Sequence, residues 1–247
     1  MSSKRSIVIR TVLALLLLII GIGAIWMYWV YKHPLEAQAR KMRRSLDTQG
    51  LERVETELSG RRSVYWVGGE GPLLVLLHGA GHQAGAWAPI VTPLLQEYRL
   101  LIPDLPGHGD SEPGSGPLAF DEVYSGLEAL LASFADQPPP VLLGNSMGAW
   151  LSMFYAYDHP EAVDRVVAVN GGPITGDPSN PSLVPADREA ARELMAMLRD
   201  PSSPAIPDFV LDDIVRRTAS GPIGRLLQAP MSFAPFLLDG HLGELTV

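Results

Sequence analysis

The chain has 247 residues and a formal net charge of −8, with 19 Lys and Arg against 27 Asp and Glu. This acidic balance argues against a nucleic-acid partner, because binding a phosphate backbone requires clustered basic side chains. The absence of Cys excludes a disulfide framework, a thiolate metal site and a cysteine nucleophile. Any nucleophile in this protein must therefore be an oxygen or a nitrogen.

An uncharged apolar run of about 21 residues lies near the N-terminus, from Thr11 to Tyr31. As a helix it is long enough to cross roughly 30 Å of hydrocarbon, and Trp and Tyr gather at its C-terminal end, as at a membrane interface. We predict a transmembrane anchor at 11–31, preceded by a basic tail at 1–10. The alternative is a cleaved secretory signal, but no A-x-A cleavage site follows the run.

A basic segment at 32–50 follows the apolar run. It is predicted to be a helix, because Leu35, Ala39, Met42 and Leu46 fall at helical spacing. Two alternatives stay open: the helix lies on an anionic leaflet, or it is a solvated linker. Five basic residues after the apolar run against three before it favour a cytoplasmic C-terminal domain. We expect a single-pass membrane protein that contacts membrane lipid.

The region 51–172 alternates strand and helix patterns. A four-residue turn separates Val54–Leu58 from Ser63–Val67 and predicts an antiparallel hairpin. Four apolar runs then indicate parallel strands, with helical stretches between them. The strands are Leu73–Leu77, Arg99–Ile102, Val141–Leu143 and Val166–Val169, and the helices lie near Trp87–Tyr98, Phe120–Ala135 and Met147–Asp158. The pattern predicts the α/β class, with a doubly wound, mostly parallel sheet.

Beyond Asn170 the alternation ends. The segment 173–241 is rich in Pro and helix formers, which predicts a helical cap with its clearest helices at Glu189–Arg199 and Phe209–Thr218. Large apolar side chains in the cap either pack it on the body or contact substrate, and packing is the favoured interpretation. These side chains are Met195, Met197, Phe209, Phe233 and Phe236.

The pentapeptide Gly144-Asn145-Ser146-Met147-Gly148 matches G-x-S-x-G and stands between an apolar strand and a helix. Such a strand-to-helix turn is sharp, and glycines at its ends let neighbouring segments approach without a Cβ clash. Ser146 would project its hydroxyl at the N-terminus of the helix, where partial positive charge favours an oxyanion. We predict that Ser146 is the nucleophile of an acyl transfer reaction.

A second loop, His78-Gly79-Ala80-Gly81, directly follows the strand that ends at Leu77. The loop resembles the HG-containing oxyanion loop of the fold in which such an elbow occurs, and the resemblance implies the Ala80 N–H as one oxyanion donor. We predict the Met147 N–H as the second donor, because the residue after the nucleophile has no intrahelical partner for its N–H. His78 is interpreted as a structural ring that braces the loop rather than as the general base.

Four segments together resemble the α/β-hydrolase superfamily, in the family's order and over residues 54–172. They are HGAGHQAGAW at His78–Trp87, DLPGHGDS at Asp104–Ser111, GNSMGAW at Gly144–Trp150 and HPEAVDRVVAVNGG at His159–Gly172. These motifs are similar to those of the monoacylglycerol-lipase-like and carboxylesterase-like branch with an N-terminal membrane anchor. The Ser in the elbow distinguishes this chain from the dehalogenase and epoxide-hydrolase branches, which carry Asp there.

The resemblance also implies residues that this sequence does not supply. In the family the triad order is Ser, then Asp or Glu, then His, whereas Asp104 and His108 match a turn that is structural. The segment 242–247 resembles the start of the acid-bearing strand region, so we expect a C-terminally truncated, incomplete α/β-hydrolase fold that is inactive by itself. If the sequence is complete, Asp177 and His241 are the fallback acid and base.

The expected activity is hydrolysis of a carboxylic ester with a lipid-like or other apolar acyl part, through an acyl-enzyme on Ser146. Cleavage of a thioester, an amide or a C–C bond by the same machinery stays open. A non-catalytic, membrane-tethered interaction domain is the alternative from another class. We see no cofactor motif and no metal-ligand cluster in the sequence, so no cofactor is expected.

Overall fold

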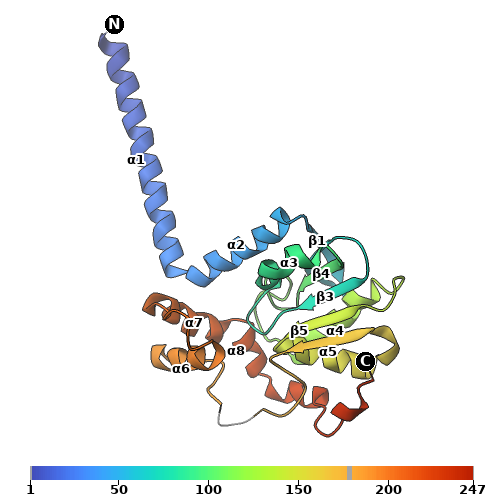
Figure 1. The fold of residues 1–247 in the computed structure, drawn as a ribbon. Coiled ribbons are helices and arrows are strands. Elements are labelled where there is room, and N and C mark those ends of the chain that lie inside the picture. Colours follow the sequence, from blue (N-terminus) through green and yellow to red (C-terminus); the bar gives the residue numbers. More distant parts are fainter. Residues whose placement is uncertain (1, 177–179, 247) are drawn as a thin grey trace.

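The computed structural model describes residues 2–176 and 180–246. Two helices begin the chain: α1 spans Ser2–Lys32 and α2 spans Pro34–Thr48. Figure 1 shows α1 standing away from the rest of the molecule, while α2 runs from the end of α1 to the domain. The part of α1 from Arg10 to Lys32 is long and apolar enough to cross a membrane, and none of it is buried. It is a candidate membrane span.

The domain is built on a sheet of six strands in the order β1-β2-β4-β3-β5-β6. The first two form the predicted hairpin, and β2 also pairs antiparallel with β4, whereas β4, β3, β5 and β6 run parallel. The strands are β1 Glu52–Leu58, β2 Arg61–Gly68, β3 Leu73–Leu77, β4 Arg99–Asp104, β5 Val141–Asn145 and β6 Arg165–Val169. The predicted fold class is therefore confirmed.

Helices cover both faces of this sheet and continue into the cap (Figure 1). Over the body they are η1 Ala84–Trp87, α3 Ala88–Leu94, α4 Phe120–Ala132, α5 Met147–Asp158 and η2 Pro160–Ala162. After β6 they are α6 Arg188–Leu198, α7 Asp208–Ser220, α8 Pro222–Leu227, η3 Pro230–Phe236 and η4 Leu242–Glu244. Every helix that the sequence predicted is present, with ends that differ by a few residues.

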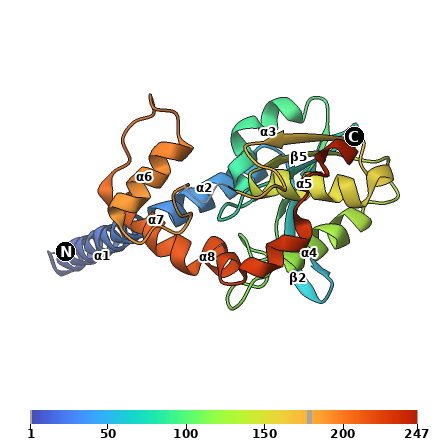
Figure 2. The same ribbon diagram turned by 90° about the horizontal axis from the view of Figure 1, so that it is seen from below.

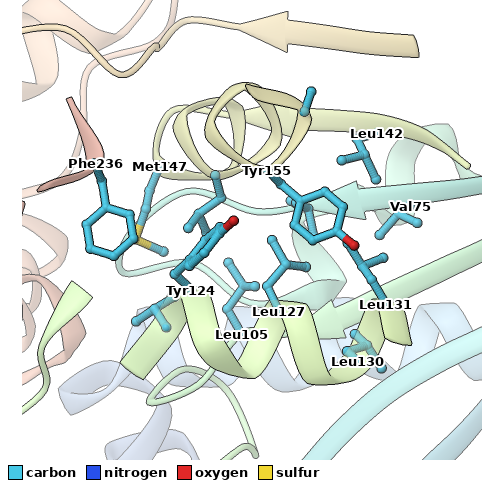
Figure 3. Packing of buried hydrophobic residues seen from close by; sticks show 14 of the residues in the cluster. Val75, Leu105, Tyr124, Leu127, Leu130, Leu131, Leu142, Met147, Tyr155 and Phe236 are labelled. Carbon is cyan, nitrogen blue, oxygen red and sulfur yellow. The ribbon is translucent and has the colours of Figure 1, made fainter. Parts of the chain in front are cut away.

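Alternate residues of the buried strands pack into two apolar clusters, one on each face of the sheet. Val75 and Leu77 point to the face covered by α4 and α5, and Leu74 and Leu76 point to the face covered by α2, η1 and α3. All five residues of β3 are buried, as expected for a parallel strand inside a doubly wound sheet. Figure 3 shows the first cluster, with Met147 and Phe236 at one end of it.

The basic helix α2 is part of the body, a role that neither of the two alternatives from the sequence anticipated. Leu46 is fully buried beside Trp66, whose indole N–H donates to Asp47 Oδ1 over 2.7 Å. A Cβ on Gly85 of η1 would lie 2.7 Å from the backbone N of Arg43. The two backbones are therefore in direct contact, and only glycine allows it at this position.

The cap helices meet the junction of α1 and α2 (Figure 2). A small third cluster joins Ala191 and Leu211 of the cap to Leu35 of α2, and the Phe209 ring stacks on Tyr31 at 5.0 Å between centroids. Most of the apolar cap side chains pack as favoured from the sequence: Met195 in this cluster, and Phe233 and Phe236 in the main core. Met197 differs, with 45% of its surface exposed.

Candidate active site

Ser146 occupies a strained turn between β5 and α5. Its φ is 54° and its ψ −116°, a conformation that non-glycine residues avoid unless the surrounding structure imposes it. A Cβ on Gly144 would lie 2.1 Å from the carbonyl oxygen of Gly148, and a Cβ on Gly148 would lie 2.0 Å from that of Leu77. Both motif glycines are thus required by close backbone approach, as the motif predicts.

The predicted oxyanion loop lies directly against this turn. A Cβ on Gly79 would lie only 3.1 Å from Cβ of Ser146, so the backbone that carries Ala80 runs beside Ser146. Met147 is the first residue of α5, where N–H groups have no intrahelical acceptor. Within residues 2–176 and 180–246, neither the Ala80 nor the Met147 N–H donates a hydrogen bond. Both donors are therefore available to a ligand oxygen beside Ser146.

Ser146 is exposed to solvent. In the part of the chain that the structure describes, no His, Asp or Glu side chain forms a hydrogen bond with it. The structure thus brings together Ser146 and the backbones of Ala80 and Met147.

His78 braces the loop His78–Gly81. Its Nδ1 lies 2.9 Å from the carbonyl oxygen of Gly79, and its Nε2 accepts the N–H of Leu105 over 3.0 Å. Both ring nitrogens are therefore in use, which requires the proton on Nδ1. Burial, with the nearby His108 ring as a smaller cause, holds the pKa of His78 well below its usual value. The ring stays neutral and joins the loop to the end of β4.

Asp104 and His108 hold the turn after β4. The Asp104 carboxylate accepts the N–H groups of Ala84 at 2.7 Å and Asp110 at 2.8 Å, and burial raises its pKa to about 6. His108 Nδ1 lies 2.9 Å from the carbonyl oxygen of Pro106, and burial lowers its pKa to about 4. Its buried Nε2 has no hydrogen-bond partner within the described ranges. These contacts join η1 to the turn and give both residues a structural position.

The two fallback residues are placed differently. Asp177 lies outside the described residues. His241 is about half exposed, its Nδ1 lies 2.8 Å from Oε1 of Glu244, and its ring centroid lies 6.3 Å from that of Tyr157. Because a helix rises 1.5 Å per residue, Tyr157 lies about 15 Å along α5 from the end that carries Ser146. The described contacts of His241 do not include the nucleophile.

A cluster with metal-ligating groups lies at that same far end of α5. His159 Nε2 lies 3.1 Å from Oε1 of Glu128 and 3.5 Å from Oδ2 of Asp158, which also accepts the Tyr124 hydroxyl at 2.8 Å. All three ligand-type side chains are partly exposed, and they already pair with one another. We interpret the cluster as a hydrogen-bonded link between α4 and α5.

Arg225 of α8 was missed by the sequence analysis. Its side chain is buried, and its guanidinium donates to the carbonyl oxygens of Gly116 at 2.7 Å, Pro113 at 2.8 Å and Gly107 at 3.3 Å. The cap is thereby fastened to the loop between β4 and α4. The pair Gly221-Pro222, with Pro at the first helical position, was the signal that could have located this short helix.

The comparisons with known proteins concern the fold that carries this site. Residues 72–201 match the family model described as alpha/beta hydrolase fold. The chain belongs to the α/β hydrolase fold family. An uncharacterised protein of Mycobacterium tuberculosis is 31% identical over 193 residues, which cover 69% of this chain and 56% of that protein. A pimeloyl-[acyl-carrier protein] methyl ester esterase of Xanthomonas oryzae is 41% identical over 93 residues, 38% of this chain and 34% of that enzyme.

The chain thus spans about half of its Mycobacterium relative and a third of the Xanthomonas esterase. Among solved structures, a bacterial membrane phospholipase A is similar with a TM-score of 0.69 and 23% identity, over 96% of this chain and 79% of that one. The carboxylesterase CesB of Bacillus subtilis gives a TM-score of 0.56 and 17% identity, over 72% and 66%. At these identities the likeness concerns the fold.

Proposed function

We propose that the protein is a serine hydrolase that cleaves a carboxylic ester with an apolar acyl part through an acyl-enzyme on Ser146. The observation that carries the proposal is the strained, solvent-open Ser146 flanked by two unengaged N–H groups. This arrangement suits a tetrahedral intermediate, whose oxyanion needs preorganised donors beside the nucleophile. The matched family, and the esterase among its similar relatives, support ester hydrolysis as the reaction.

In the first half-reaction, Ser146 Oγ adds to the ester carbonyl while a general base takes the hydroxyl proton. The carbonyl oxygen becomes an oxyanion between the N–H groups of Ala80 and Met147, and the N-terminus of α5 adds favourable partial charge. Collapse of the intermediate breaks the bond to the alcohol oxygen, which leaves with a proton. Water then attacks the acyl-enzyme by the same route and releases the acid. The acid and base that assist Ser146 are left unassigned, and Asp177 and His241 stay only the fallback pair from the sequence, because the described contacts of His241 do not include Ser146.

The candidate span in α1 adds a location to the proposal. We infer that α1 anchors the protein in a membrane, with the larger basic count after the span favouring a cytoplasmic domain. An anchored hydrolase meets substrates that partition into the bilayer, and this agrees with an apolar acyl part. The membrane lipid itself is then both the surroundings of α1 and a source of ester substrate.

The deciding experiment uses the full chain in mild detergent, with Ser146→Ala as the test variant and Ser133→Ala as the matched control. Labelling by a fluorophosphonate and hydrolysis of p-nitrophenyl butyrate are measured. We expect Ser146→Ala to remove labelling, because the probe forms its bond with the nucleophile itself. In a preparation that turns over the ester, the same variant should lower turnover by at least about 10³-fold. Ser133, at the end of α4, has no contact with the site, and its variant should behave as wild type. Equal labelling of both variants would disprove the nucleophile.

A further inference from the structure

Cap helix α8 lies against the oxyanion loop. Gly81 follows Ala80, has a φ of +78° and carries no side chain. A Cβ there would lie 2.8 Å from Cδ1 and 3.1 Å from Cγ1 of Ile223. The Ile223 side chain therefore touches the backbone of this loop. On the other side of Ala80, Gly79 approaches Ser146 equally closely. Ile223 and Ser146 consequently flank the same three-residue loop.

The exposure of α8 changes along its length, and Ile223 lies at the boundary. The next three residues, Gly224, Arg225 and Leu226, are buried, and Leu227 after them is 43% exposed. Ile223 itself is half-buried, while the nearby Ser146 is exposed. Its side chain thus lies at the edge of the cap, against the Gly81 end of the loop, and is not part of the buried interior.

Two independent contacts hold Ile223 in this place. Arg225 fixes α8 from one side through three backbone carbonyls of the loop between β4 and α4. Leu226, 2% exposed, fixes it from the other side by packing in the main core cluster that includes Met147. A side chain held on a rigid element restricts what can occupy the neighbouring space, since it cannot move aside without breaking these contacts.

We propose that Ile223 is a specificity-determining residue, which limits the bulk of the ester on the Gly81 side of the oxyanion loop. This inference rests on the proposed function of Ser146. With the oxyanion between Ala80 and Met147, the reacting carbon lies beside the loop, and in this proposal one of its two substituents, the acyl chain or the alkoxy group, extends toward Gly81. The group on the Gly81 side meets the branched Ile223 side chain. The site is thereby selective for esters whose chain on that side is slender and unbranched.

The test uses the full chain in detergent with Ile223→Ala and Ile223→Phe, and with Leu227→Ala as the matched control on the exposed side of the same helix. Two pairs of esters are compared. The pair that differs in the acyl group is p-nitrophenyl butyrate and p-nitrophenyl 2-methylbutyrate. The pair that differs in the alcohol is propyl acetate and 2-butyl acetate. We expect Ile223→Ala to shift the ratio of kcat/KM in one pair toward the branched ester by about 10-fold, because one or two methyl groups in a pocket discriminate 10- to 200-fold. Ile223→Phe should shift the same ratio the other way, and Leu227→Ala should not change it.

Unchanged ratios in both pairs, with Ser146-dependent turnover intact, would overturn the role of Ile223 and leave the proposed function standing. If Ser146→Ala retains wild-type turnover, the proposed function fails, and the inference fails with it. For a preparation without ester turnover, Ser146 is labelled with two alkylfluorophosphonates, one with a methyl and one with an isopropyl ester group. The ratio of their labelling rates then takes the place of the ratio of kcat/KM. Should Ile223→Phe fail to fold, the smaller Ile223→Ala decides alone, since it adds no atoms to the core.

Discussion

The carboxylate of Asp213, in cap helix α7, accepts a hydrogen bond from the N–H of Leu35, in the first turn of α2, over 3.0 Å. That N–H has no acceptor within its own helix. The Asp213 side chain is 1% exposed, and its other oxygen binds Arg216, which also donates to the carbonyl oxygen of Lys32 at the end of α1. Helix α7 thus satisfies polar groups on both sides of the break between α1 and α2.

Replacing Asp213 tests this joint between cap and anchor. We expect Asp213→Ala to lower the free energy of unfolding by about 2 kcal/mol, because a helix loses its cap and a partly buried N–H loses its acceptor. The neighbouring Asp212 pairs with Arg188 at the surface, where it is 53% exposed, so Asp212→Ala should cost much less than Asp213→Ala. Denaturant titration of both variants in detergent gives their free energies of unfolding. Equal losses of stability in the two variants would contradict the role of Asp213 in joining the cap to the N-terminal helices.

Gly148 is the glycine whose replacement should most directly damage the nucleophile turn. A Cβ there would meet the carbonyl oxygen of Leu77 at 2.0 Å, so Gly148→Ala forces β3 and α5 apart. We expect a loss of about 3 kcal/mol in stability and loss of fluorophosphonate labelling of Ser146. The control is Gly172→Ala, because the nearest atom to a Cβ there is Met153 Sδ at 3.6 Å. A labelled, stable Gly148→Ala protein would refute the close approach.

The body of the domain was predictable because its signals are local. The run Leu73–Leu77 is apolar throughout, and β3 has those bounds. The elbow motif fixes where a strand stops and a helix begins, and α5 begins at Met147 as the motif requires. The Gly-rich turns adopt backbone conformations that few other residues tolerate. The positions of the glycines therefore predict where strands and helices end.

Non-local contacts could not be predicted in the same way. The basic residues of α2 suggest a helix in water or on a leaflet, and nothing in them reveals that Gly85 admits the backbone of Arg43. Likewise, Ile223 reaches the oxyanion loop from about 140 positions further along the chain, through a helix of six residues. Such a short helix has too few positions to show a period, so its place depends on tertiary packing that sequence patterns do not encode.

Arg225 offers a test of how firmly α8 is attached to the body. We expect Arg225→Leu to lower the free energy of unfolding by about 3 kcal/mol, because three carbonyl oxygens lose a charged donor in a buried place. Arg199 is the matched control: it also lies in the cap and donates to one carbonyl, that of Pro204, but the bond is exposed. Arg199→Leu should stay within about 0.5 kcal/mol of wild type. Similar losses in the two variants would argue against a fastening role of Arg225.

The candidate span predicts how the protein fractionates. A helix that crosses a bilayer resists alkaline carbonate, so we expect the full chain to remain in the membrane pellet after the wash. Leu17 and Ile20 lie near the middle of the span and are 68% and 65% exposed. A double Leu17→Arg, Ile20→Arg variant should appear in the supernatant, since each Arg costs about 3 kcal/mol at the helix centre. Release of the wild-type chain by the same wash would exclude a spanning helix.

The buried ring of His108 predicts a pH dependence of stability with a defined sign. Burial lowers its pKa from 6.5 to about 4, so between these values the unfolded chain binds a proton that the folded protein does not. The stabilisation from the neutral ring is complete above pH 6.5 and is lost as the pH falls toward 4, by about 3 kcal/mol in all. Asp104 acts in the opposite sense, because its raised pKa makes the folded state the better proton binder between 3.8 and about 6.

The two effects separate in a variant that cannot titrate at position 108. His108→Asn keeps a donor for the carbonyl oxygen of Pro106 and removes only the imidazole equilibrium. Denaturant midpoints of wild type and variant, measured from pH 7 to pH 4.5, should differ by an amount that shrinks as the pH falls, because only the wild type loses the stabilisation of a neutral ring. The Asp104 contribution is common to both proteins and cancels in the difference. Parallel pH profiles for the two proteins would show that His108 is protonated equally in the folded and unfolded states, and the burial argument would then be wrong.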